Sequence, residues 1–117
     1  MIENTPSLDW ILVTKRVGNI RKMVPASGLP RNTIILASIV NQEEADRDLN
    51  KLLALEYEHD LAHAVGVSYE PALGAVDWTP WLPGLSWLIV GGESAQGAPA
   101  RPFRIEWARS AVEQCRA

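Results

Sequence analysis

The feature that most constrains this chain is an apolar run that stops abruptly at two glycines. Residues 87–90 read Trp-Leu-Ile-Val and are followed by Gly91, Gly92, Glu93 and Ser94. Apolar residues on consecutive positions are typical of a strand that is buried on both faces, as in parallel sheets. Polar groups just past the carboxyl end of such a strand are where α/β folds commonly place their sites. The run therefore predicts a parallel sheet with a site at its carboxyl edge.

Three further strands are predicted: a buried strand over residues 10–13, one over 33–40 that is apolar at nearly every position, and a less apolar one over 63–69. Each of them ends on polar residues, which are Thr14-Lys15-Arg16, Asn41-Gln42 and Glu70. Helices are expected over 18–24, from residue 42 onward and from 105 to the end, where apolar residues recur at helical spacing. Asn41 with Glu44 matches a capping box. Because strands alternate with helices, we expect an α/β fold of about four parallel strands.

Length and composition fit one soluble α/β domain over residues 1–117, smaller than a full α/β barrel. A net charge of -3 weighs against a nucleic-acid or anionic-membrane surface. Cys115 is the only cysteine, which excludes an intrachain disulfide and an all-cysteine metal site. Its place on the apolar stripe of the last helix predicts a buried thiol. Because neither a membrane-length apolar run nor a signal pattern is present, we expect a cytoplasmic protein.

The polar strand ends predict a site that binds a ligand or a partner. Its candidate residues are Lys15, Arg16, Gln42, Glu70, Glu93, Ser94 and Arg101. Lys15 and Arg16 could hold a phosphate or a carboxylate. Glu70 and Glu93 could converge, which would split their pKa values or bind a hard cation. The alternative is structural, since both acids could pair with Lys15, Arg16 or Arg101.

Two other patterns, a glycine pair and a histidine pair, are weak evidence for a functional site. Gly91-Gly92 is too short to be a dinucleotide-binding fingerprint. His59 and His63 have the spacing of a zinc pair on a helix, but no zincin motif surrounds them. No metal site is therefore predicted, and no catalytic residue can be assigned.

Five short motifs follow one another in an order that resembles a known family. They are Asp9-Trp10 through Thr14-Lys15-Arg16, Asn41-Gln42 with Ala45-Asp46, Glu70-Pro71 with Leu73-Gly74, Gly91-Gly92-Glu93-Ser94, and Arg101-Pro102 with Trp107. In this order they resemble the phage gp thirty-seven/sixty-eight proteins of phages and bacterial genomes, over nearly the whole chain. That family is similar to radical S-adenosylmethionine enzymes, which implies a (β/α) barrel of the TIM type.

Members of that family begin with closely spaced cysteines that could hold an iron–sulfur cluster, and they close with a further strand. This chain has neither, so the resemblance implies the C-terminal half of the barrel, trimmed or encoded as a short protein. It implies an iron–sulfur cluster and S-adenosylmethionine only in the full-length form, and no cofactor in this chain. The function expected is that of a phage or mobile-element-derived binding domain, with inhibition of a host defence system as one role. The alternative is a fragment or subunit of a radical S-adenosylmethionine-like enzyme that contributes the substrate side.

Half of a barrel leaves one sheet face and two strand edges uncovered, and such apolar surface is unfavourable in water. We therefore expect a homo-oligomer, most simply a dimer, or pairing with a complementary barrel half. The alternative is a flatter sheet with a helix that crosses the exposed face.

Overall fold

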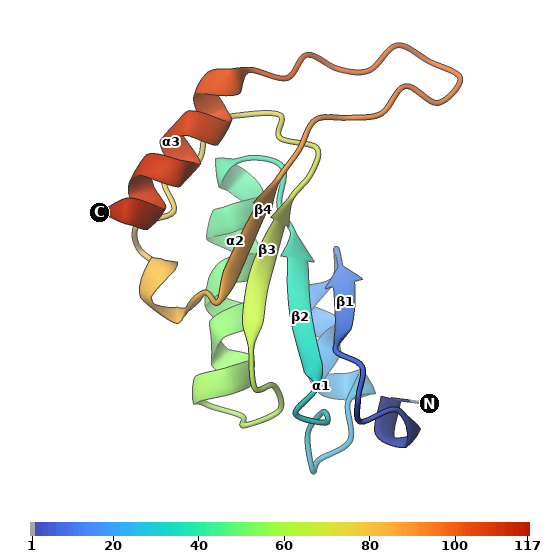
Figure 1. Ribbon diagram of the computed structural model, residues 1–117. Helices are drawn as coiled ribbons and strands as arrows, with labels where there is room; N and C mark the ends of the chain where they lie inside the picture. Colours follow the sequence, from blue (N-terminus) through green and yellow to red (C-terminus); the bar gives the residue numbers. More distant parts are fainter. Residues whose placement is uncertain (1) are drawn as a thin grey trace.

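Four parallel strands form one sheet in the order β1-β2-β3-β4 in the computed structural model, which describes residues 2–117 (for residue 3, the backbone alone). The strands are β1 (Trp10–Thr14), β2 (Thr33–Ser38), β3 (Val65–Tyr69) and β4 (Trp87–Val90). The order and the parallel direction confirm the predicted α/β fold. The sheet is open rather than closed into a barrel (Figure 1).

Three α-helices connect or follow the strands. They are α1 (Ile20–Met23), α2 (Gln42–Tyr57) and α3 (Ile105–Arg116), and short 3-10 turns lie at Ile2–Asn4, Val17–Asn19 and Leu82–Gly84. The side chain of Asn41 accepts a hydrogen bond from Glu44 N at 3.0 Å. The Glu44 carboxylate in turn accepts one from Val40 N at 3.1 Å. The Asn41 cap fixes the start of α2 where the sequence predicts it, and the Glu44 carboxylate reaches one residue beyond the N-cap of a standard capping box.

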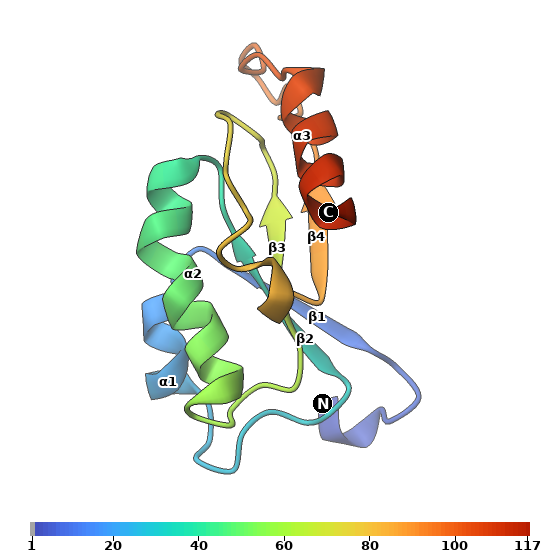
Figure 2. The ribbon, with the colours of Figure 1, turned by 90° about the vertical axis from the view of Figure 1, so that its left-hand side faces the viewer.

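The hydrophobic core lies on one side of the sheet, between the strands and α2. The buried side chains of α2 are joined in this core by alternate residues of β2 and β3, which are Ile35, Ala37, Val65, Val67 and Tyr69. Figure 2 shows α1 and α2 together on this side of the sheet. The ring of Tyr69 meets that of Trp78 edge to face at 5.0 Å, and burial raises the pKa of Tyr69 to about 12.

The other side of the sheet, which we call the open face, is not crossed by any helix of the described chain (Figures 1 and 2). The strand register gathers on it the residues that alternate with the core positions: Ile11, Val13, Ile34, Leu36, Ser38, Ser68, Trp87 and Ile89. Trp87 is 45% exposed there, whereas Leu36, Ser38 and Ser68 of the two central strands are buried. The uncovered face agrees with the expected half-barrel shape, and the helix crossing considered as its alternative is not found among the described residues.

The prediction of a buried strand over residues 10–13 is wrong. Ile11 and Val13 are 44% and 57% exposed, and Leu12 on the opposite side of the strand is exposed as well. The reason is topological, because β1 pairs only with β2 and so forms one margin of the sheet (Figure 1). Its sequence is that of an interior strand in an edge position.

The prediction of a buried Cys115 is also wrong, because that thiol is exposed. α3 lies beside β4 (Figures 1 and 2) and enters the core through Ala111, with Trp107 packed against it. Gln114 donates a hydrogen bond to Val76 O at 3.0 Å and accepts one from Trp78 N at 2.5 Å. This polar docking turns the apolar stripe with Cys115 toward solvent. Within residues 2–117, no helix has both the length and the apolar character needed to cross a membrane.

Candidate functional site

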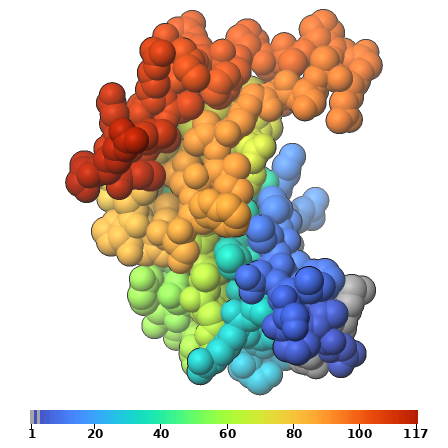
Figure 3. Space-filling view, viewed as in Figure 1, coloured from blue at the N-terminus to red at the C-terminus, as the bar shows by residue number. Residues whose placement is uncertain are grey.

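The carboxyl ends of the four strands lie along one edge of the sheet, which we call the strand-end edge (Figure 1). From the end of β4 the chain leaves this edge as a long arm, residues 91–104, before it enters α3. In the space-filling view the arm projects well beyond the body of the molecule (Figure 3). The predicted site residues therefore fall on two structures, the strand ends and the arm.

Glu93 and Arg101 clamp the base of the arm. Nη2 of Arg101 lies 2.6 Å from Oε1 of Glu93, and the Arg101 backbone N–H donates to Oε2 at 2.8 Å. These hydrogen bonds lower the pKa of Glu93 to about 2. Of the roles considered for Glu93, the structure shows the pairing with Arg101. Ser94 is exposed in the loop that the clamp closes.

Glu70 follows β3 as an exposed carboxylate. Ser68 Oγ donates a hydrogen bond to its Oε1 at 3.4 Å, and Ser68 is paired in register with Ser38 of β2. Residues two apart in a strand share a face, so these three side chains form a polar row on the open face at the strand-end edge. We call this the Ser38–Ser68–Glu70 row.

Gly91 makes room for the Glu70 side chain. A Cβ atom at position 91 would lie 2.9 Å from Glu70 Oε2 and 3.1 Å from its Cγ. The same backbone segment is held by hydrogen bonds from Gly91 N to Tyr69 O at 3.2 Å and from Ala72 N to Gly91 O at 2.8 Å. The absence of a side chain at Gly91 thus allows the Glu70 carboxylate to lie close to the backbone of the strand-end edge.

Lys15 and Arg16 follow β1, two strands away from Glu70. At the usual spacing of strands this separates their backbones by roughly 10 Å. The Arg16 N–H donates to Thr14 Oγ1 at 2.9 Å, and both basic side chains are exposed. Among the described residues neither base forms an ion pair with Glu70 or Glu93.

Gln42 is engaged within the fold. Its Oε1 accepts a hydrogen bond from Asp77 N at 2.7 Å, and its Nε2 donates to Asp46 Oδ1 at 2.9 Å. The side chain ties the start of α2 to the segment after β3. Of the seven predicted site residues, the structure joins Glu93 with Arg101 and sets Glu70 beside Ser68. It keeps Lys15 and Arg16 apart from both acids.

The strand-end edge carries a carboxylate, Glu70, after β3 and two basic side chains, Lys15 and Arg16, after β1. The described residues contain two ion pairs, Arg47–Asp48 and Arg101–Glu93, so Glu70 has no cationic partner among them. An unpaired carboxylate with neighbouring hydroxyls can accept hydrogen bonds from a cationic or polyhydroxylated group. The exposed bases at the end of β1 can bind an anionic group at the other end of the edge.

A metal centre finds no support in the geometry. No group of three or more His, Cys, Asp or Glu side chains with a metal-binding arrangement occurs among the described residues. His59 lies just after α2 and His63 in the connection before β3, and they do not share a helix.

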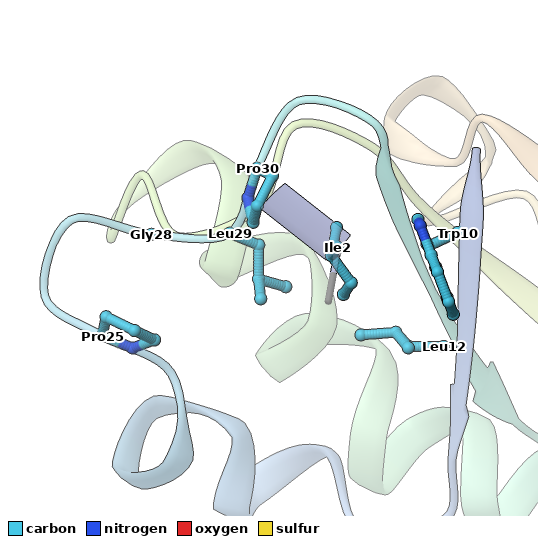
Figure 4. Close-up of a pocket in the computed structure, with 7 residues that line it drawn as sticks. All are labelled: Ile2, Trp10, Leu12, Pro25, Gly28, Leu29 and Pro30. Carbon is cyan, nitrogen blue, oxygen red and sulfur yellow. The ribbon is translucent and has the colours of Figure 1, made fainter. Parts of the chain in front are cut away.

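An apolar cavity of about 440 Å³ lies at the opposite end of the sheet, near the start of β1 (Figure 4). Figure 4 shows the side chains of Leu12 and Trp10 on one side of it and Leu29 and Pro30 on the other. Its lining is apolar and lacks charged groups among the described residues, so it is a place for hydrophobic contact rather than for chemistry.

Comparison with known proteins gives one family. The family model described as "Protein of unknown function (DUF5131)" matches residues 1–117. The chain belongs to the DUF5131 family. No curated protein and no solved structure gave a match.

Ser38 and Ser68 are the site residues that the sequence analysis missed. The signal was present for Ser68, because a residue two positions before Glu70 shares its face in a strand. Ser38 could be found only with the register of β2 against β3, which pairs it with Ser68. Sequence alone does not give that register.

Proposed function

We propose that this DUF5131 chain is a binding domain whose ligand or protein partner engages the strand-end edge at the Ser38–Ser68–Glu70 row. The observation that carries the proposal is the exposed Glu70 carboxylate, which lies over Gly91, accepts a hydrogen bond from Ser68 and has no ion-pair partner among the described residues. A surface group held in this way is available for recognition without breaking an internal salt bridge. The chemistry it favours is a cationic or hydrogen-bond-donating group.

The arm supports this assignment. The arm leaves the strand-end edge directly after β4, and the Glu93–Arg101 clamp closes it at its base. A molecule bound at the row could therefore also contact the base of the arm. A phage or mobile-element origin, and a role as an inhibitor of a host defence system, fit a small binding domain and rest on the family resemblance of the motifs.

The test uses L-argininamide as a cationic probe, followed by backbone amide shifts in nuclear magnetic resonance. We expect shifts centred on residues 68–72 and 91–92, and binding weakened about tenfold or more in Glu70→Gln because the acceptor loses its charge. Glu113→Gln, a neutralised acid on the exposed side of α3, is the matched control. Equal binding by both variants, or no shifts at millimolar probe, would contradict the proposal.

A second candidate is a subunit that supplies the substrate side of a radical S-adenosylmethionine-like enzyme. The uncovered open face and the exposed β1 favour it, because both are surfaces that the rest of a barrel would cover. Mixing the chain with the cysteine-bearing half of a family member would then give a stable one-to-one complex. Failure to form that complex would leave the binding domain as the better account.

The residues of this chain do not fit an iron–sulfur cluster. Such clusters are held by several thiolates, whereas Cys115 is the only cysteine and sits exposed in the last turn of α3. Any cluster in the second candidate would have to be held by the partner.

A further inference from the structure

The two margins of the sheet are not equivalent. β4 has α3 beside it, whereas β1 has no neighbour on its outer side in the described chain (Figures 1 and 2). The five residues of β1 carry no charge, and Ile11, Leu12 and Val13 are all exposed. Exposed, uncharged edge strands are surfaces on which another strand can pair.

The backbone groups available for such pairing can be identified. Trp10 N donates to Asn32 O of the segment leading into β2 at 2.7 Å. In a parallel pair, alternate residues of a strand bond to the same neighbour. Since Trp10 and Leu12 face β2 with their backbone groups, the N–H and C=O groups of Ile11 and Val13 point outward.

We propose that β1 pairs antiparallel with β1 of a second copy of the chain, about a two-fold axis at Leu12. This register places Ile11 opposite the partner's Val13, so that the outward N–H and C=O groups of both residues bond in pairs. It also joins the two open faces, so that the exposed apolar side chains of Ile11 and Val13 lie side by side. The two sheets become one sheet of eight strands.

Charge selects this register and this partner. Asp9 and Lys15 flank β1 and are both exposed. An axis at Leu12 sets Asp9 opposite the partner's Lys15, and by symmetry this happens twice. An axis at Ile11 would set Asp9 opposite the partner's Val13, and an axis at Val13 would set Lys15 opposite the partner's Ile11. Only the register at Leu12 matches both the outward backbone groups and the charges.

Cysteine cross-linking tests the register in a Cys115→Ser background. Residues opposite each other in a non-hydrogen-bonded antiparallel pair have Cα atoms about 4.5 Å apart, which lies within disulfide range. We expect Leu12→Cys to form a covalent dimer on mild oxidation, and Ile11→Cys and Val13→Cys to do so far less. Preferential cross-linking at residue 11 or 13 would overturn the register.

A charge swap tests the pairing without touching the apolar residues. The wild-type chain should sediment as a dimer at micromolar concentration. Lys15→Glu alone or Asp9→Lys alone should weaken the dimer about tenfold, and the double variant Asp9→Lys, Lys15→Glu should restore it. Arg16→Glu makes the same change of charge one residue away and should have a smaller effect. A wild-type chain that stays monomeric at all concentrations, or a double variant as weak as the single ones, would overturn the proposal.

Discussion

Asn41 stabilises α2 through a single side-chain acceptor. Because its oxygen accepts from Glu44 N, Asn41→Ala should lower the free energy of unfolding by about 1 kcal/mol, measured by urea denaturation. Asn41→Ser, which keeps an acceptor at the same place, should lose much less. Equal losses in the two variants would show that the cap bond does not carry the effect.

Glu93 should titrate far below an ordinary glutamate. Its pKa is lowered from 4.5 to about 2 by hydrogen bonds from Arg101. The stabilisation that this pair gives to the folded arm is therefore fully present above pH 4.5 and is lost as the pH falls toward 2. Carbon-detected titration of the Glu93 carboxyl should show a midpoint near 2. In Arg101→Gln it should return toward 4.5, and a midpoint near 4.5 in the wild type would contradict the clamp.

Gly91 offers a separate test of the proposed site. A Cβ atom at this position would lie 2.9 Å from the Glu70 carboxylate, and that flexible side chain can move away. Gly91→Ala should therefore displace Glu70 and weaken L-argininamide binding while changing stability little. Gly92→Ala is the neighbouring control, since its nearest contact is with Phe103 rather than Glu70. Unchanged L-argininamide binding in Gly91→Ala would show that the position of the Glu70 carboxylate over Gly91 does not matter for binding.

At the scale of elements, Gln114 attaches α3 to the body of the molecule. Gln114→Ala would leave Trp78 N and Val76 O without the partners they now have, and lost hydrogen bonds of this kind cost about 1–3 kcal/mol. Amide hydrogen exchange in α3 should accelerate correspondingly. Glu113→Ala, on the exposed side of the same helix, should leave exchange nearly unchanged, and a similar acceleration in both would contradict the docking role.

The strands and α2 were predictable because local patterns determine them. Consecutive apolar residues mark β2 and β4, the less apolar β3 is rich in β-branched and aromatic residues, and Asn41 with Glu44 marks the start of α2. The orientation of α3 was not predictable from apolar periodicity, because a polar residue, Gln114, fixes its inward side. The exposure of β1 was not predictable either, since the same apolar sequence suits an interior strand, and only the sheet order makes it an edge.

The candidate site was likewise predictable from the sequence only in part. The sequence identified Glu70, Glu93 and Arg101 as strand-end residues, and allowed that an acid would pair with Arg101, which the structure shows. It missed Ser38 and Ser68, whose meeting depends on the register of β2 and β3. It also set Lys15 and Arg16 in one site with Glu70, although two strand spacings separate them.

At the scale of the whole molecule, the sheet has one covered face, one open face and one free margin. Its helices bury the core on a single side, and Ile11, Val13 and Trp87 remain exposed on the other. A parallel sheet of this kind is normally covered on both faces. Pairing at β1 would remove the free margin, and the open face would remain available beside the strand-end edge.

Amide hydrogen exchange of β1 tests this view of an incomplete sheet most directly. The Leu12 N–H faces β2 and should be protected at every protein concentration, whereas the N–H groups of Ile11 and Val13 point outward. We predict that Ile11 and Val13 exchange rapidly at high dilution and become protected as the concentration rises. If these two amides stay unprotected at all concentrations, β1 does not pair with a second copy of the chain.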